Sequence, residues 1–336
     1  MDKTPLEDWI VNKIGIERNR EALENYQLGQ LRETIKYVKE RSAFYGRKLS
    51  GLFPDHISQV RDIEKIPFTY PKDIGANPYG FLCIPQRQVE RIVTLNTSGT
   101  SSKAKRIFFN KEDIEAIIDF FHHGMASLTN KRDRLLVLLP GDSYGSIGNL
   151  LRKALDNHLE LCMVGGLLED RKKTIEDIKK YRINCIVGLP SQIIYLSRME
   201  KEIFQERIDK VLLCSDYAPK TIINDLTHNY GCQVFIHYGM TETGYGGGVM
   251  CQALKGYHLR EGDLYFEIVD PTTGQVLGED QYGEIVFTTL TRQAMPLIRY
   301  RTGDIGAISL ADCPCGSFLK SIKTVEGRID NRVSIG

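Results

Sequence analysis

Hydrophobic and polar positions follow different patterns in successive parts of the chain. Between Glu17 and Arg41, apolar residues recur at helical spacing among charges, which predicts an amphipathic helix. Its apolar positions are Leu23, Tyr26, Leu31, Ile35 and Val38. Prolines then interrupt residues 50–88 repeatedly, so we expect loops and short helices there.

From residue 89, short apolar runs alternate with amphipathic segments. The apolar runs predict strands at 89–95, 106–109, 135–139, 160–164, 185–188, 210–214 and 233–237. The amphipathic segments predict helices at 113–128, 146–155, 169–181, 191–203 and 220–228. Such alternation favours a mainly parallel sheet with helices on both faces. In sheets of this kind, ligands bind at the carboxyl ends of the strands.

After residue 250 the pattern of apolar and polar residues changes again. Strands expected at 263–269, 283–288 and 304–309 are separated by Gly, Pro, Thr and Asp turns, which is typical of an antiparallel, barrel-like segment. We therefore predict an α/β fold in three parts. These are a helical N-terminal region (1–88), an α/β core (89–250) and a small β-barrel-like subdomain (251–336).

Composition narrows the class of protein. The chain has 336 residues, of which 42% are hydrophobic and 26% charged, as in ordinary globular proteins. A net charge of +1 argues against a broad nucleic-acid surface. No apolar run approaches the ~18 residues of a membrane span, and the first residues lack an apolar signal core. The eight cysteines are widely spread, which favours reduced thiols and a cytoplasmic protein. Together with the charge and the lack of an apolar span, we expect no membrane or nucleic-acid partners.

A polar loop at 97–105 (TSGTSSKAK) is the first candidate for chemistry. Its hydroxyls, its glycine and its two lysines could wrap a polyphosphate. It is not a Walker A loop, because the GxxxxGK[ST] pattern is absent. On these residues alone, a phosphate-binding loop and a plain polar hairpin loop both stay open.

A second loop, at 237–248 (HYGMTETGYGGG), follows a predicted strand. The Glu242 carboxylate beside the Thr241 hydroxyl could hold Mg²⁺ and a phosphate oxygen together. The alternative is a glycine-rich turn in which Glu242 is merely solvated.

Two further segments carry acidic and basic candidates. Asp304, after Thr-Gly, could accept hydrogen bonds from ribose hydroxyls, or could instead pair with Arg299 or Arg301. Arg328, in the segment 326–330 (EGRID), could meet a phosphate or a ribose.

In this order, the four segments resemble the motifs TSGTTGxPK, YGxTE, RTGD and GRxDD of the adenylate-forming superfamily, which includes acyl-CoA synthetases, adenylation domains and luciferases. They correspond to residues 97–105, 238–242, 301–304 and 327–331. The helical start is similar to the phenylacetate–CoA ligase-like branch. The resemblance spans almost the whole chain and makes residues 89–250 the nucleotide- and acyl-binding core.

The resemblance implies a role for each matching residue. The residues implied to bind ATP or AMP are Thr97, Ser98, Gly99, Thr100, Ser101, Ser215, Asp216, Tyr238, Gly239 and Asp304. The implied catalytic residues are Lys105, Thr241, Glu242 and Arg328, and Glu242 would also bind Mg²⁺. The implied acyl pocket contains Tyr144, His237, Gly244 and Tyr245, where a glycine run would leave room for a flat or bulky acid.

The chain also departs from the family motifs. Ser102 stands in place of Gly and Ala104 in place of Pro, and Asn331 replaces the second acid after Gly-Arg. The segment 215–219 (SDYAP) takes the place of a Gly-(Ala/Gly)-Glu-Pro stretch that lines adenine.

The implied reaction is attack by a carboxylate on the α-phosphorus of ATP, which gives an acyl-adenylate and pyrophosphate. CoA is the expected acceptor, and the acid would be aromatic or compact. In the family, a small mobile C-terminal domain supplies a further lysine, and we expect it to lie beyond residue 336. Two alternatives are transfer to a protein or carrier thiol, and a zinc-stabilised nucleotide-binding scaffold without catalysis. A homodimer is also left open.

Cys251, His258, Cys313 and Cys315 form a further candidate site. A Cys-x-Cys pair followed by Gly is typical of metal knuckles, and a Cys₃His set suits a closed, structural Zn²⁺ site. The resemblance places a Cys/His cluster in the same region. The alternative is three unrelated thiols and a surface histidine, and we favour zinc.

Overall fold

The computed structural model describes residues 4–95, 104–309 and 311–329. Within these ranges the α-helices are α1 (Pro5–Ile14), α2 (Arg20–Arg41), α3 (Ala43–Lys48), α4 (Pro71–Ala76), α5 (Lys111–Ala126), α6 (Ile147–Leu155), α7 (Arg171–Lys180), α8 (Pro190–Met199), α9 (Lys201–Arg207) and α10 (Lys220–Tyr230). The 3₁₀ helices are η1 (Pro54–His56), η2 (Val60–Lys65), η3 (Pro78–Phe81), η4 (Gln86–Gln88) and η5 (Thr241–Thr243). The strands are β1 (Arg91–Leu95), β2 (Lys105–Phe109), β3 (Arg134–Leu138), β4 (Leu161–Val164), β5 (Cys185–Gly188), β6 (Lys210–Leu213), β7 (Gln233–Tyr238), β8 (Gly248–Val249), β9 (Tyr257–Leu259), β10 (Leu264–Val269), β11 (Gly283–Thr289), β12 (Tyr300–Ser309) and β13 (Ser321–Arg328).

One long sheet organises the described part of the chain. Its strand order is β10-β11-β12-β13-β9-β8-β7-β6-β5-β3-β4. The strands from β7 to β4 pair in parallel, which confirms the predicted parallel sheet. β1 and β2 form a separate antiparallel hairpin.

The strands after residue 250 pair antiparallel, as predicted. Among the described strands, however, the pairing order is open, with β10 at one end and β4 at the other. These strands extend the parallel sheet and do not close a barrel by themselves. The three-part division at 88/89 and 250/251 stays a prediction.

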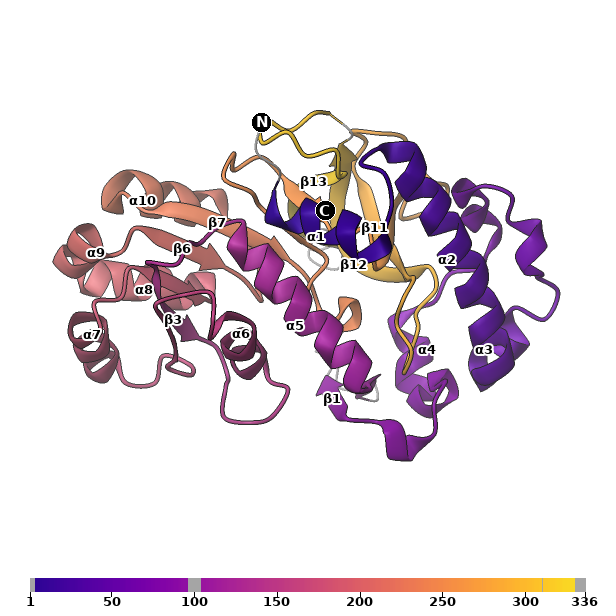
Figure 1. Cartoon of the computed structure of the whole chain (residues 1–336), viewed down its shortest axis with the longest axis horizontal. Helices are drawn as coiled ribbons and strands as arrows, with labels where there is room; N and C mark the ends of the chain where they lie inside the picture. Colours follow the sequence, from indigo (N-terminus) through magenta and orange to yellow (C-terminus); the bar gives the residue numbers. More distant parts are fainter. Residues whose placement is uncertain (1–3, 96–103, 310, 330–336) are drawn as a thin grey trace.

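Helices cover the parallel strands on two faces, as Figure 1 shows on its left side. Side chains alternate along a strand, so Leu135 and Val137 point to one face and Leu136 and Leu138 to the other. The first pair packs with α5 and α6, and the second pair packs with the helices α7 to α10. Both faces of these strands are therefore buried, which explains their continuous apolar runs.

The N-terminal helices pack against the antiparallel half, at the right of Figure 1. The Tyr45 hydroxyl accepts from Ile298 N (2.9 Å) and lies 3.0 Å from Thr69 Oγ1. Thr69 Oγ1 in turn donates to the Ile298 carbonyl (2.7 Å). These contacts fix the segment that leads into β12.

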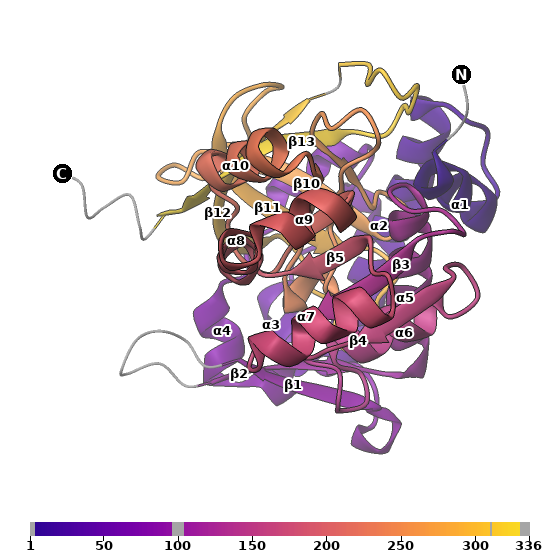
Figure 2. The same ribbon diagram turned by 90° about the vertical axis from the view of Figure 1, so that its left-hand side faces the viewer.

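The two halves of the sheet meet at a narrow seam, which we define as the three joints β7–β8, β8–β9 and β9–β13. Each joint registers two residue pairs. In this seam His237 is paired with Val249, and Val249 with His258, so both histidines lie at one level. Figure 2 views the same molecule from the side of its helices α7 to α10.

Helix ends account for the main differences from the predicted elements. Residues 191–203 were expected to form one helix, but Glu200 has φ −132° and ψ 51° and separates α8 from α9. The break lets Ile203 and Phe204 reach the same apolar cluster as Ile193 and Leu196. In the described ranges, no helix is both long and apolar enough to cross a membrane.

Candidate active site

The candidate residues gather where neighbouring strands end. Ser215 and Asp216 follow β6, and Tyr238 ends β7, so they lie at the carboxyl edge of the parallel half. Ser215 has φ 65°, a left-handed conformation that costs energy for a residue with a side chain. Backbone strain of this kind is common at ligand sites, and it marks the segment where adenine was expected.

Partly buried Lys105 and the buried residues Glu242 and Tyr300 form a triad of polar groups. Lys105 Nζ donates to Glu242 Oε1 (2.5 Å), and Tyr300 Oη donates to the same oxygen (2.9 Å). Lys105 Nζ also lies 3.3 Å from Tyr300 Oη. Glu242 is only 3% exposed, so the alternative of a solvated turn carboxylate is wrong.

The surroundings of the Lys105–Glu242–Tyr300 triad change the pKa of the Tyr300 hydroxyl. Burial and the Glu242 charge raise the pKa of the Tyr300 hydroxyl, which therefore stays a hydrogen-bond donor. Tyr300 and Lys105 come from β12 and β2, far from Glu242 in the sequence. Three elements thus converge on one carboxylate oxygen.

Asp304 sits in a second network beside this triad. Tyr238 Oη donates to Asp304 Oδ2 (3.2 Å), and Arg328 Nη1 lies 3.5 Å from Asp304 Oδ1. Burial raises the pKa of Asp304, and burial together with the Asp304 charge raises the pKa of Tyr238 well above its usual value. The structure therefore brings together Tyr238, Asp304 and Arg328, the residues predicted for adenine, ribose and phosphate contacts.

The alternative partners of Asp304 are occupied elsewhere. Arg299 makes a two-point ion pair with Glu267 (3.1 and 2.8 Å), and Arg301 pairs with Glu284. The proposed pairing of Asp304 with Arg299 or Arg301 is therefore wrong. The Asp304 carboxylate instead contacts Tyr238 and Arg328.

Arg292 supports the Glu242 loop from behind and was not singled out from the sequence. Its Nη1 donates to the Glu242 carbonyl (2.6 Å), and burial lowers its pKa to about 10. Gly244 has φ 73°, and a Cβ there would lie 2.8 Å from Arg292 Nη2. The left-handed backbone of this turn favours glycine here. The turn itself is η5, which begins at Thr241.

The expected acyl pocket is brought together only in part. Phe120 faces His237, with ring centroids 6.3 Å apart, and burial lowers the pKa of His237 to about 4. A Cβ on Gly246 would lie 2.0 Å from the Phe120 ring. Gly246 therefore makes room for the Phe120 ring, and the expectation that the glycine run leaves space for the acid stays a prediction.

Tyr245 and Tyr144 differ in their surroundings. Tyr245 is buried, stacks on Phe109 at 5.9 Å and has φ 60°. Tyr144 is 45% exposed, with the Lys153 ammonium 4.4 Å from its ring centroid. A pocket role therefore stays a prediction for both. Gly239 packs too closely on His237 and the Tyr245 carbonyl to carry a side chain.

Some expected residues lie outside the described ranges. These are the phosphate-loop residues Thr97, Ser98, Gly99, Thr100 and Ser101, together with Ser102 and Asn331. Their roles stay predictions.

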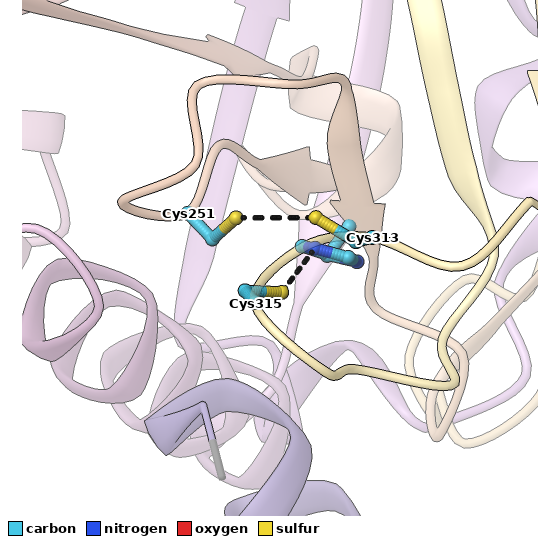
Figure 3. Close-up of side chains that lie close together, drawn as sticks. Cys251, Cys313 and Cys315 are labelled. Atoms are coloured by element: carbon cyan, nitrogen blue, oxygen red, sulfur yellow. Dashed lines mark hydrogen bonds between the residues drawn. The ribbon is translucent and has the colours of Figure 1, made fainter. Parts of the chain in front are cut away.

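The cysteine–histidine set lies at the seam, since His258 is in β9 and Cys251 follows β8. Figure 3 shows its three cysteines close together. The potential ligand atoms of Cys251, His258, Cys313 and Cys315 all lie within 4.8 Å of one another. Cys251 Sγ is 3.6 Å from Cys313 Sγ, and Cys315 Sγ is 3.2 Å from His258 Nε2. Tetrahedral zinc bound by thiolates places sulfur atoms about 3.8 Å apart, so the set fits this ion. His258 is 2% exposed, and the alternative of a surface histidine is wrong.

Helix α1 contacts the turn that carries two of these thiols, those of Cys313 and Cys315. Glu7 Oε2 accepts from Ser317 Oγ (2.5 Å) and from Phe318 N (2.8 Å), and Arg18 pairs with Glu7. Arg18 Nη2 also donates to the Gly316 carbonyl (3.2 Å). The N-terminal helix therefore stabilises the 313–318 turn.

Comparison with known proteins agrees with this geometry. Residues 86–291 match the model of the AMP-binding enzyme family. A phenylacetate-coenzyme A ligase of Thermus thermophilus is 29% identical over 333 residues, covering 94% of this chain and 72% of the relative. The enzyme of the same name from Pseudomonas putida is 29% identical, covering 85% and 66%.

Solved structures show the same fold. A 2-hydroxyisobutyryl-CoA ligase in complex with 2-HIB-AMP and CoA superposes with a TM-score of 0.82 at 19% identity, covering 94% of this chain and 70% of that one. The predicted kinship with adenylate-forming enzymes is confirmed, because the family match covers more than half of the sequence. The chain belongs to the family of AMP-binding enzymes.

Proposed function

We propose that the protein activates a carboxylic acid with ATP and transfers the acyl group to CoA. In the first step a carboxylate oxygen attacks the α-phosphorus, the bond to the bridging oxygen breaks, and pyrophosphate leaves. In the second step the CoA thiol attacks the acyl carbonyl, loses its proton, and displaces AMP. The relatives named phenylacetate-coenzyme A ligase support an aromatic or compact acid.

The observation that carries this proposal is the convergence of two networks, Lys105–Glu242–Tyr300 and Tyr238–Asp304–Arg328. Asp304 has carboxylate lone pairs that could accept from ribose hydroxyls, while Tyr238 Oη donates to its Oδ2. Phosphoryl chemistry of this kind depends mainly on positioning and charge neutralisation. A buried carboxylate and nearby cations offer both.

Two metals belong to the proposal. Glu242 would hold Mg²⁺, because carboxylate oxygens are suitable ligands for this hard ion. The charge of the ion would stabilise the phosphates. Cys251, His258, Cys313 and Cys315 would hold Zn²⁺ in a closed site with a structural role. The eight unbridged cysteines support a reducing compartment such as the cytoplasm. A homodimer, and the absence of nucleic-acid partners, stay predictions.

Pyrophosphate exchange into ATP, measured with a panel of carboxylic acids, tests the first step. Exchange that requires one acid supports activation, whereas ATP binding without exchange for any acid favours a non-catalytic scaffold. AMP release that requires CoA then distinguishes CoA from a protein or carrier thiol as acceptor. Asp304→Asn should weaken AMP binding in the same preparation.

A further inference from the structure

The Lys105–Glu242 ion pair is nearly shielded from water. The side chains of Lys105 and Glu242 are 14% and 4% exposed, and Tyr300 is 1% exposed. A buried carboxylate without an opposite charge is strongly disfavoured, because burial removes its hydration. The Lys105 ammonium therefore compensates the Glu242 charge.

The same carboxylate cannot serve two cations without cost. Lys105 Nζ contacts Glu242 Oε1 directly. The two oxygens of one carboxylate are only roughly 2 Å apart, so Oε2 is also close to the ammonium. A divalent ion on either oxygen would thus stand close to the ammonium and repel it. Binding of a metal at Glu242 must weaken the contact with Lys105.

Tyr300 is placed differently from Lys105. Its hydroxyl is neutral, donates to Glu242 Oε1, and is held by a strand that the Tyr45–Thr69 contacts fix. A neutral donor is compatible with a metal ion on the same carboxylate, because it carries no net charge. Tyr300 can therefore keep Glu242 oriented while the cation beside it changes.

We propose that Lys105 is a placeholder for the metal ion. It neutralises Glu242 until Mg²⁺ and ATP bind, then leaves the carboxylate, and its long side chain becomes available to the phosphates. Tyr300 is the positioning residue that holds Glu242 during this exchange. The inference rests on the proposed role of Glu242 as a Mg²⁺ ligand.

The affinity of the nucleotide-free protein for Mn²⁺, measured by electron paramagnetic resonance, tests this exchange directly. Lys105→Met removes the competing charge and keeps an unbranched side chain. We expect this variant to bind Mn²⁺ at least about tenfold more tightly than the native protein. The gain should disappear in the double variant Lys105→Met/Glu242→Gln.

A matched control comes from another buried pair of the same kind. Lys210 Nζ lies 2.7 Å from Asp133 Oδ2, and the two side chains are 16% and 4% exposed. Lys210→Met also leaves a buried carboxylate unpaired, but at the amino end of β6, whereas Glu242 follows the carboxyl end of the neighbouring strand β7. It should not produce Mn²⁺ binding that depends on Glu242.

Unchanged Mn²⁺ affinity in Lys105→Met would overturn the placeholder role. Thermal unfolding gives a second readout, because Mn²⁺ should raise the Tm of Lys105→Met more than that of the native protein. An equal rise in both proteins also counts against the proposal. Failure of the proposed function itself looks different: Glu242→Gln alone would then leave the binding of Mn²⁺ with a non-hydrolysable ATP analogue unaffected.

Discussion

Tyr238 and Asp304 are joined across the sheet by a hydrogen bond of 3.2 Å from the tyrosine hydroxyl to Oδ2 of the carboxylate. Tyr238 ends a parallel strand and Asp304 lies in the antiparallel half. The contact thus links the two halves at the point where we propose that a nucleotide binds.

Replacing Tyr238 by phenylalanine should weaken AMP binding up to about tenfold. The ring would still pack, but Asp304 would lose one donor, and a hydrogen bond of this kind contributes about 0.5–1.5 kcal/mol. Calorimetric titration with AMP measures the change. Tyr282→Phe is the control, because the exposed Tyr282 hydroxyl contacts Thr324 on the same sheet. Equal weakening of AMP binding by the two variants would contradict the prediction.

Gly246→Ala should destabilise the protein by about 1–3 kcal/mol, because the new methyl group would overlap the Phe120 ring. Denaturant unfolding measures this loss. A second substitution, Phe120→Leu, should restore part of it by vacating space. Gly29→Ala, in the interior of α2 with no atom near its Cβ position, should instead stabilise by about 0.5–1 kcal/mol. Destabilisation by Gly246→Ala that Phe120→Leu fails to relieve would contradict the packing explanation.

Chelation of bound zinc should lower the Tm by several degrees, because an ion that binds only the folded state stabilises that state. Metal analysis should find one zinc per chain in the native protein and none in Cys315→Ser. Cys162→Ser is the control, since this partly buried thiol lies outside the cluster. A Tm that stays constant after verified metal loss would rule out a structural role.

Acid should destabilise the fold as pH falls from about 6.5 to about 4. Burial lowers the pKa of both His237 and His123 to about 4, so the folded state binds fewer protons than the unfolded state in this window. Stability from these groups is fully present above the ordinary histidine pKa and is lost below it. His123→Gln should flatten this part of the curve of Tm against pH, whereas exposed His228→Gln should not.

A further loss of stability should follow as pH falls from about 4 to about 2. Arg260 and Lys13 hold the pKa of buried Asp263 at about 2, against the cost of its burial. Its protonation removes two ion pairs.

Most of the parallel half could be predicted because burial on both faces leaves uninterrupted apolar runs such as β3 and β6. Helix α1 had no range of its own within the predicted helical N-terminal region, and strand β13 was missed. Helix α1 depends on distant partners such as the 313–318 turn, which Glu7 contacts, and β13 mixes polar and apolar residues without a clear period.

The motif residues Tyr238, Glu242 and Asp304 could be predicted, but not the roles of Tyr300 and Arg292. Local spacing gives no sign that the Tyr300 hydroxyl reaches a carboxylate 58 positions earlier. Such contacts are set by the pairing of strands, and the register of β12 in the sheet is a tertiary property.

The seam of two-pair joints also has a consequence for how the molecule opens. Few backbone hydrogen bonds cross from β7 to β13, so the apolar core that contains residues of both halves carries most of their coupling. Once packing in that core is weakened, amides of β3 to β6 and of β10 to β12 should exchange with solvent at two separate free energies of opening. The nucleotide site, built from both halves, is complete only while neither half has opened.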